Sequence, residues 1–322
     1  HDIIILYKIC SKNKRLLKMN LENFIKKLSK EQKSELVQLL SVEDMDEHSR
    51  FENGRICPHC KNNKVVKRGI VAKHQRFYCP HCKKYFTIYA NTILNYTKKD
   101  ISVWKRYIKM MFEPKPKTIK EIAEKLNISD RTAFRWRHKI LSVLETKFMN
   151  DSLSGIVEAD ETFVLTAHKG FHIEGVKGRK RGGVSKFRGL SHEQTGVLVA
   201  IDRSKNLVSQ VYGFGRITTQ QVSNVLNNRI KNDSLMITDK CAAYRHFAEE
   251  NSLTLKQLKA GQPYGKEIHL NTVNNYHAVF KRWVRGFNGI STKYLNRYLA
   301  WFKFVKQKND CGYLFNNLIL AN

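Results

Sequence analysis

The sequence predicts a mixed α/β protein in which two small modules precede a larger domain of alternating strands and helices. Two C-x-x-C pairs lie within residues 53–90, a capped helix pair follows, and after Asp151 the apolar pattern alternates between strand and helix periods. These observations divide the chain into an N-terminal helical segment, a cysteine-rich module, a helical region, an α/β domain and a C-terminal tail. The ranges are 1–52, 53–90, 100–148, 151–308 and 309–322.

The composition indicates a polyanionic partner. The chain has 322 residues, of which 42% are hydrophobic, and 58 Lys and Arg against 28 Asp and Glu produce a net charge of +30. Nucleic acid is the commonest polyanion that such a charge binds. The sequence has no secretory signal and no run of about 18 apolar residues that could span a bilayer. We therefore expect no membrane partner. The two C-x-x-C pairs indicate metal binding in a reducing cytosol and so predict a cytoplasmic protein.

The four paired cysteines predict a structural zinc site of the zinc-ribbon type. Cys57 and Cys60 are separated from Cys79 and Cys82 by 18 residues, in a segment that is otherwise short, rich in turns and poor in strands. Two such pairs place four thiolates around one tetrahedral Zn²⁺. The alternative is four reduced cysteines in a small core, but so short a segment needs a metal to stay folded. Basic residues around the pairs suit contacts to phosphate groups.

Residues 118–141, "TIKEIAEKLNISDRTAFRWRHKIL", have the pattern of a helix-turn-helix. Apolar residues line the first helix, a turn follows at "NIS", and Ser129 is placed to cap the second helix. The second helix of this motif enters the major groove of DNA, which predicts DNA contacts for Arg131, Arg135 and Arg137. An ordinary helical hairpin would bury the same positions. The basic, glycine-rich stretch at 176–189 predicts a loop in which Lys180 and Arg181 contact phosphates.

The α/β domain begins with strands at 154–164, 195–204 and 206–215 that form a β-meander. A helix at 218–230 and the buried strand "SLMITD" follow, and then a helix, a strand near 253–258 and the helix at 272–287. The predicted elements therefore follow the order of an RNase H-like fold, which is three strands, a helix, a strand, a helix, a strand and a helix. We therefore predict that fold for residues 151–308.

This fold predicts a polar site built from three separated segments. The first strand lies beside the fourth, so Asp160 and Asp239 would face each other. The last helix crosses nearby, and its residues Asn274, His277 and Lys281 lie within roughly 60° of one another around the helix axis. Oxygen ligands of this kind would hold two Mg²⁺ (or Mn²⁺) ions about 3.5 to 4 Å apart. His277 could be a ligand, a proton donor or a phosphate contact, and Lys281 could hold a DNA phosphate.

Each of these residues also has an ordinary structural explanation. Asn274 is a good N-cap, His277 and Lys281 form an acceptable solvent-facing stripe, Asp160 could lie on an edge strand, and Asp239 could cap the next helix. Taken singly, these explanations are the more economical ones. Three polar groups that converge in one fold favour a functional site.

At this point the chain resembles the bacterial insertion-sequence transposases of the DDE superfamily, and specifically the IS1595 family, whose catalytic domain is called ISXO2-like. The resemblance covers about residues 53 to 305 and includes "VEADETF", "GVLVAIDRS", "MITDKCAAY" and "HLNTVNNYHAVFKRWVRGFNGISTKYLNRYLAWF". It implies that Asp160 and Asp239 are catalytic aspartates and that Asn274 takes the third position. His277 and Lys281 would be auxiliary polar residues.

The resemblance implies a magnesium-dependent transposase of the bacterial cytoplasm, associated with the nucleoid. It would bind the terminal inverted repeats of its element, cleave the DNA strand and join it to target DNA, acting on double-stranded DNA as a homodimer or larger assembly. One alternative is a DNA-binding regulator derived from an inactive transposase, which keeps the zinc ribbon and the helix-turn-helix. Another is a structure-selective nuclease of the same fold.

Overall fold

A computed structural model describes residues 47–51, 54–71, 74–113, 115–149, 151–170, 174, 185–187, 189–191, 193–259, 265 and 267–307. The described residues fall into two compact units, one within His1–Asn95 and the other within Tyr96–Asn309. Most of the predicted N-terminal segment, the tail at 309–322, and Lys180 and Arg181 of the basic loop lie outside the described residues. None of the helices in the described ranges is long and apolar enough to cross a membrane.

The first unit contains a small antiparallel sheet in the order β1-β2-β3. Its elements are α4 (Glu47–Arg50), β1 (Val66–Val71), β2 (His74–Cys79) and β3 (Lys84–Thr87). Alternation along β2 buries Phe77 and Cys79, which pack with Phe86. The sequence predicted turns in place of this sheet, because strands of this length carry too few apolar residues to stand out from a turn-rich segment.

The second unit begins with three helices, α5 (Ile101–Met111), α6 (Ile119–Leu126) and α7 (Asp130–Phe148). Thr118 and Glu121 form a capping box at the start of α6, and Asn127 ends that helix in the left-handed conformation at φ 50°. Ser129 caps α7 by accepting a hydrogen bond from the Thr132 N–H. The predicted pair of helices, its turn and its cap are therefore confirmed.

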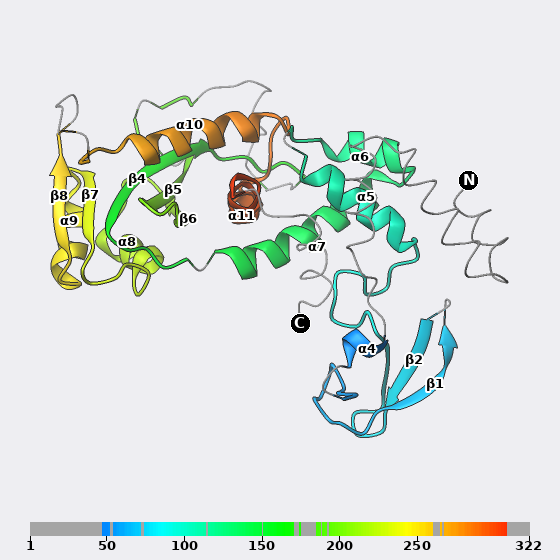
Figure 1. Ribbon diagram of the computed structural model, residues 1–322. Helices are drawn as coiled ribbons and strands as arrows, with labels where there is room; N and C mark the ends of the chain where they lie inside the picture. The colour runs from blue at the N-terminus through cyan, green and yellow to red at the C-terminus, as the bar shows by residue number, and fades with distance from the viewer. Residues whose placement is uncertain are drawn as a thin grey trace, which may run out of the picture. The chain divides into compact units, whose positions relative to one another are not determined.

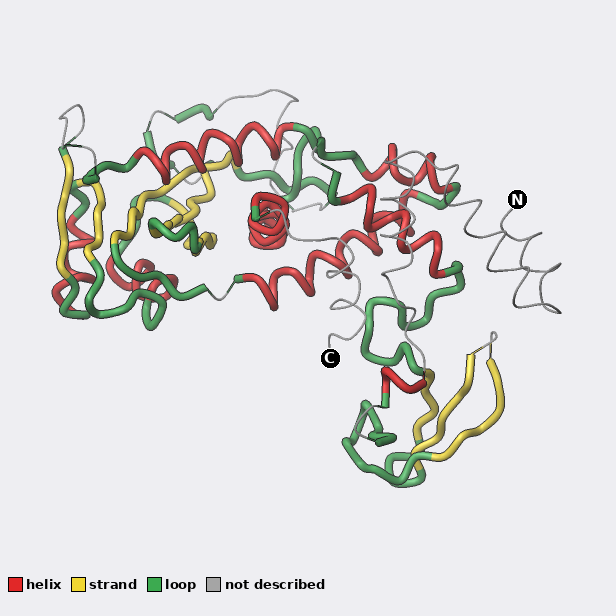
Figure 2. Tube along the Cα trace, viewed as in Figure 1, coloured by secondary structure: helices red, strands yellow, loops and turns green. Residues whose placement is uncertain are grey.

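The second unit contains a mixed five-stranded sheet. Its strands are drawn as arrows in Figure 1 and in yellow in Figure 2. Its strands are β4 (Ile156–Leu165), β5 (Gln194–Asp202), β6 (Leu207–Phe214), β7 (Leu235–Asp239) and β8 (Thr254–Leu258). They lie in the order β6-β5-β4-β7-β8, with β4 antiparallel to β5 and parallel to β7. The first strand of the sheet lies beside the fourth, as the RNase H-like prediction requires.

Helices cover both faces of this sheet. On one face, α8 (Thr219–Leu226) and α9 (Ala242–Glu250) share a core with the side chains of Val157 and Ala159 from β4. The other face meets α10 (Asn271–Arg285), which lies along β4 and β5, and α11 (Leu295–Lys306), which lies against β6 and α7. Because alternate residues of a strand point to opposite faces, residues 158 and 160 of β4 face α10.

Candidate active site and metal centre

Asp160 lies on β4, partly buried under α10. Its backbone pairs with Val199 of β5, so it lies well inside the sheet and not on an edge strand. Burial raises the pKa of Asp160 to about 6, and the negative charge of Asp239 adds to this effect while Lys281 opposes it. The charges of Asp239 and Lys281 therefore both act on this carboxylate.

Asp239 is the last residue of β7, the strand that lies parallel to β4. The register pairs Glu158 with Ile237, and two residues further along each strand come Asp160 and Asp239. The two carboxylates are therefore level with each other on adjacent strands, as the sequence predicted. Asp239 Oδ1 also accepts a hydrogen bond from Cys241 N–H at 3.1 Å, so the same side chain helps the chain turn into α9.

Helix α10 places His277 beside Asp160, and the charge of Lys281, one turn further along the helix, acts on the same carboxylate. His277 Nδ1 lies 3.9 Å from Asp160 Oδ2, and its side chain is 9% exposed. Burial lowers the pKa of His277 to about 4, and Lys281 adds to this effect, so the imidazole is neutral at pH 7 and the contact is not an ion pair. His277 Nε2 is buried without a hydrogen-bond partner among the described residues. The solvent-facing stripe considered for this helix therefore does not describe His277.

Asn274 lies one turn before His277 on α10 and is exposed. The described hydrogen bonds do not join its side chain to Asp160 or Asp239, and it does not cap α10, whose N-cap position is Leu270. Its helical position still puts it on the same side of α10 as His277. The role of Asn274 as a metal ligand therefore stays a prediction, whereas the alternative role as the N-cap of α10 is excluded.

Glu161 is the acidic residue next to Asp160 on β4, and the sequence predicts no role for it. It points to the opposite face from Asp160, where it accepts a hydrogen bond from the Tyr244 hydroxyl of α9. Burial raises its pKa to about 7, and the charges of Asp160 and Asp239 add to the shift. Strand alternation shows that Glu161 lies on that face, but only the packing of α9 reveals its buried partner.

The four paired cysteines form one cluster in the first unit. The Sγ atoms of Cys57 and Cys82 lie 3.6 Å apart, as do those of Cys60 and Cys79, and all four lie within 4.8 Å of one another. A tetrahedral zinc ion with Zn–S bonds of about 2.3 Å separates its sulfur ligands by roughly 3.8 Å. The cluster therefore fits a zinc ion in both ligand type and spacing.

The three arginines predicted to contact DNA have different environments in α7. Arg131 and Arg135 are exposed, whereas Arg137 is 1% exposed. The Arg137 guanidinium lies over the rings of Trp301 and Phe287, at 5.3 and 5.6 Å from their centroids, and donates a hydrogen bond to the Lys117 carbonyl at 2.8 Å. The prediction for Arg137 is therefore wrong, because this side of α7 packs against α11.

Two comparisons with known sequences found similar proteins. Residues 152–306 match the family described as the ISXO2-like transposase domain. The chain is 25% identical over 272 residues to an uncharacterized protein in transposable element ISH50 of Halobacterium salinarum, covering 80% of this chain and 87% of that protein.

Two solved structures are also similar to this chain. The pre-cleavage Mos1 transpososome is 14% identical, covers 67% of this chain and 77% of its own, and has a TM-score of 0.24. The mariner Mos1 paired end complex with Mg is 13% identical and has a TM-score of 0.28, and the match covers 66% of this chain and 74% of the Mos1 chain.

Proposed function

We propose that the protein is a DNA transposase, because residues 152–306 match the ISXO2-like transposase domain family. It binds the terminal inverted repeats of its element and catalyses metal-dependent strand cleavage and strand transfer. The observation that carries this proposal is the pair Asp160 and Asp239, which lie level on adjacent parallel strands, with His277 of α10 beside Asp160.

The donor set at this site fits divalent magnesium or manganese. Asp160 and Asp239 supply hard carboxylate oxygens, and the amide of Asn274 would complete the set from α10. The burial and negative charge that raise the pKa of Asp160 are the conditions that a bound cation would relieve. When bound, two such ions would activate the attacking hydroxyl and stabilise the leaving oxygen.

The remaining side chains of the site have their own tasks in this proposal. Lys281 is a cation beside Asp160, and it orients a backbone phosphate of the bound strand. His277 is neutral at pH 7, and its buried Nε2 can donate to or accept from a group on the DNA according to its tautomer. The covering helix also limits the access of water to the carboxylates.

DNA binding is proposed for two parts of the chain. On α7, Arg131 and Arg135 are exposed in the first half of the second helix of a helix-turn-helix, the part of that motif that reaches base edges. In the first unit, Lys67 and Arg68 of β1 are exposed, and Arg76 of β2 is half-buried, with its guanidinium 4.6 Å from the centroid of the Tyr85 ring. These cations suit phosphate contacts.

The proposal is tested with labelled DNA that carries the ends of the element, in the presence of Mg²⁺ or Mn²⁺. We expect cleaved and joined products from the intact chain, and their loss in the variants Asp239→Ala and Asn274→Ala. Asp233→Ala is the matched control, because Asp233 is an exposed acidic residue just before β7, the strand that ends at Asp239. Tight, specific binding of the ends without any cleavage would instead identify a regulator. Cleavage of branched or hybrid DNA without joining would identify a nuclease.

A further inference from the structure

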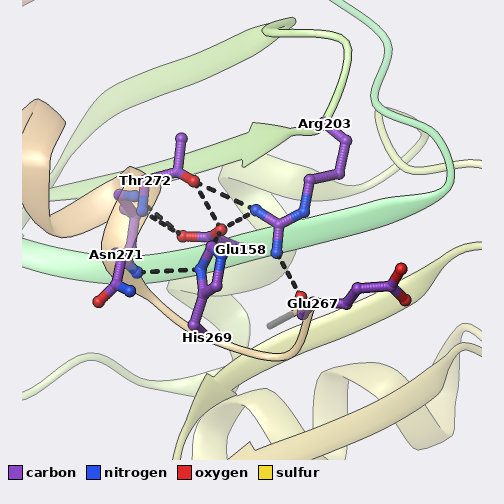
Figure 3. Close-up of polar contacts among 7 residues, drawn as sticks. Glu158, Arg203, Glu267, His269, Asn271 and Thr272 are labelled. Carbon is purple, nitrogen blue, oxygen red and sulfur yellow. Dashed lines mark hydrogen bonds and ion pairs between the residues drawn. The ribbon is translucent and has the colours of Figure 1, made fainter. Parts of the chain in front are cut away.

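A second carboxylate on β4 is completely buried and contacts α10. Glu158 is two residues before Asp160 on the same face of the strand, and its side chain is 0% exposed. Its Oε2 accepts hydrogen bonds from the backbone N–H groups of Thr272 and Val273, at 2.8 and 3.0 Å. Its Oε1 accepts one from the Thr272 hydroxyl at 2.7 Å. Figure 3 shows this carboxylate at the first turn of α10.

These contacts make Glu158 a cap for a helix whose own N-cap residue supplies none. The N-cap position of α10 is Leu270, which makes no side-chain capping hydrogen bond. The first N–H groups of a helix lack partners within the helix, and the N-terminus attracts negative charge. Glu158, which lies more than 100 residues earlier in the sequence, satisfies two of these groups, the N–H groups of Thr272 and Val273. The Asn271 N–H donates instead to His269 Nδ1, at 3.3 Å.

Arg203 stabilises the buried charge and extends the connection to the loop before α10. It follows the end of β5, and its guanidinium donates to Glu158, to the Thr272 hydroxyl at 3.1 Å and to the Glu267 carbonyl at 2.6 Å. His269 Nδ1 also lies 3.1 Å from Glu158 Oε1. The cluster joins β4, β5, the loop at 267–270 and the first turn of α10 (Figure 3).

The cluster lies one short step from the candidate active site along both elements. Asp160 follows Glu158 by two residues, roughly 6.6 Å along the strand, and Asn274 follows Thr272 by two residues, roughly 3 Å along the helix axis. A shift or rotation of this helix end would move Asn274 and His277 relative to Asp160. No other hydrogen bond among the described residues joins the backbone of α10 to β4.

We propose that Glu158 is a positioning residue, which caps α10 from β4 and so sets the register of Asn274 and His277 against Asp160. This inference rests on the proposed function for the meaning of that register. It differs from a purely structural role, in which Glu158 would stabilise the fold without controlling the site. Glu158 itself touches neither DNA nor metal in this proposal.

The first test is amide hydrogen exchange of the full chain with the variant Glu158→Gln, which keeps the size of the side chain and removes its charge. We expect the amides of Thr272 and Val273 to exchange about tenfold faster or more, because they lose a charged acceptor. The rest of the sheet should keep its protection. This measurement needs neither metal nor DNA, so it remains informative if the protein does not cleave DNA.

Asp202→Asn is the matched control for burial of a carboxylate. Asp202 is 1% exposed and accepts hydrogen bonds from the Ser154 and Asn206 N–H groups, but it has no described bond to α10. We expect this variant to leave exchange at Thr272 and Val273 unchanged. Unchanged exchange there in Glu158→Gln, or equal acceleration in both variants, would overturn the proposal.

The second test measures the consequence for the site. On end-containing DNA we expect Glu158→Gln to lower kcat on the order of 100-fold, as small misplacements of catalytic groups do, with little change in KM or DNA affinity. Normal kcat in the Asp202→Asn variant would show that loss of a buried carboxylate does not by itself slow cleavage, so that the effect of Glu158→Gln reflects the position of α10. A Glu158→Gln variant with normal kcat would overturn the proposal, whereas loss of cleavage in the intact chain would count against the transposase function alone.

If Glu158→Gln does not fold, Thr272→Val replaces it. This isosteric change removes only the hydroxyl that donates to Glu158 and accepts from Arg203. We expect faster exchange in the first turn of α10 and a lower kcat, both smaller than for the glutamate variant. Normal values of both in a folded Thr272→Val protein would overturn the proposal.

Discussion

At the scale of single residues, Arg137 shows how position outweighs residue type. It lies on the α7 stripe that also contains Ala133, Ile140 and Leu144, all buried. That helical spacing marks an inward position, and the long aliphatic stem with a planar guanidinium can stack on the rings of α11. This stripe can be recognised in the sequence. A charged residue in a predicted DNA-binding helix nevertheless favours a surface position, which is why the sequence predicts a DNA contact for Arg137.

Arg131 and Arg137 therefore form a matched pair for mutagenesis. Arg137→Ala should lower the free energy of unfolding by about 2–4 kcal/mol, because it removes a buried hydrogen bond and two ring contacts. Arg131→Ala should change stability by less than about 0.5 kcal/mol but weaken DNA binding. Denaturant unfolding and fluorescence anisotropy measure the two effects. Reduced DNA affinity with normal stability in Arg137→Ala would contradict the buried position.

At the scale of elements, the strands β1 to β3 are too short to be stable alone. Their core consists of a few side chains around Phe77, and two of the four cysteines are fully buried within it. The fold of this unit should therefore depend on the metal. By contrast, the five-stranded sheet has a large apolar core under α8 and α9.

We predict one zinc ion per chain, lost in the variant Cys79→Ser. Chelation should unfold residues 54–95 and leave the secondary structure of the second unit in place, since zinc binding and folding are coupled in such modules. Elemental analysis gives the stoichiometry, and amide NMR spectra report each unit. Cys241→Ser is the control, because Cys241 is a buried cysteine in the other unit and should leave the zinc content unchanged. Zinc bound equally by both variants would exclude this cluster.

At the scale of the whole molecule, the net charge of +30 exceeds what one binding helix requires. Basic residues occur in both compact units, so a polyanion can be contacted by each of them. Binding by many such contacts releases many condensed cations from DNA, and the affinity then depends steeply on salt concentration.

We therefore expect the affinity for DNA to fall by about a thousandfold or more between 50 and 200 mM salt, the range typical of six to ten phosphate contacts. Anisotropy titrations over this range measure the slope. The paired variant Arg131→Ala with Arg135→Ala should lower the slope, because it removes up to two contacts. A salt-independent affinity would contradict binding through phosphates.

The sequence by itself determined those features that depend on local spacing. The two cysteine pairs, the Ser129 cap and the order of strands and helices after Asp151 follow from periodicity and short motifs. The adjacency of Asp160 and Asp239 follows from the RNase H-like fold that this order predicts. The sequence did not predict the three short strands around the cysteines, because these strands carry too few apolar residues. The catalytic roles of Asn274, His277 and Lys281 stay predictions.

Only the tertiary structure decided which polar side chains are buried and what they contact. Glu158 caps a helix that begins more than 100 residues later, His277 is buried beside Asp160, and Arg137 stacks on Trp301. Periodicity predicts which face of an element is apolar, but it does not predict which polar group fills a gap on that face. That choice depends on the distant element packed against it, and so on long-range contacts that no local pattern encodes.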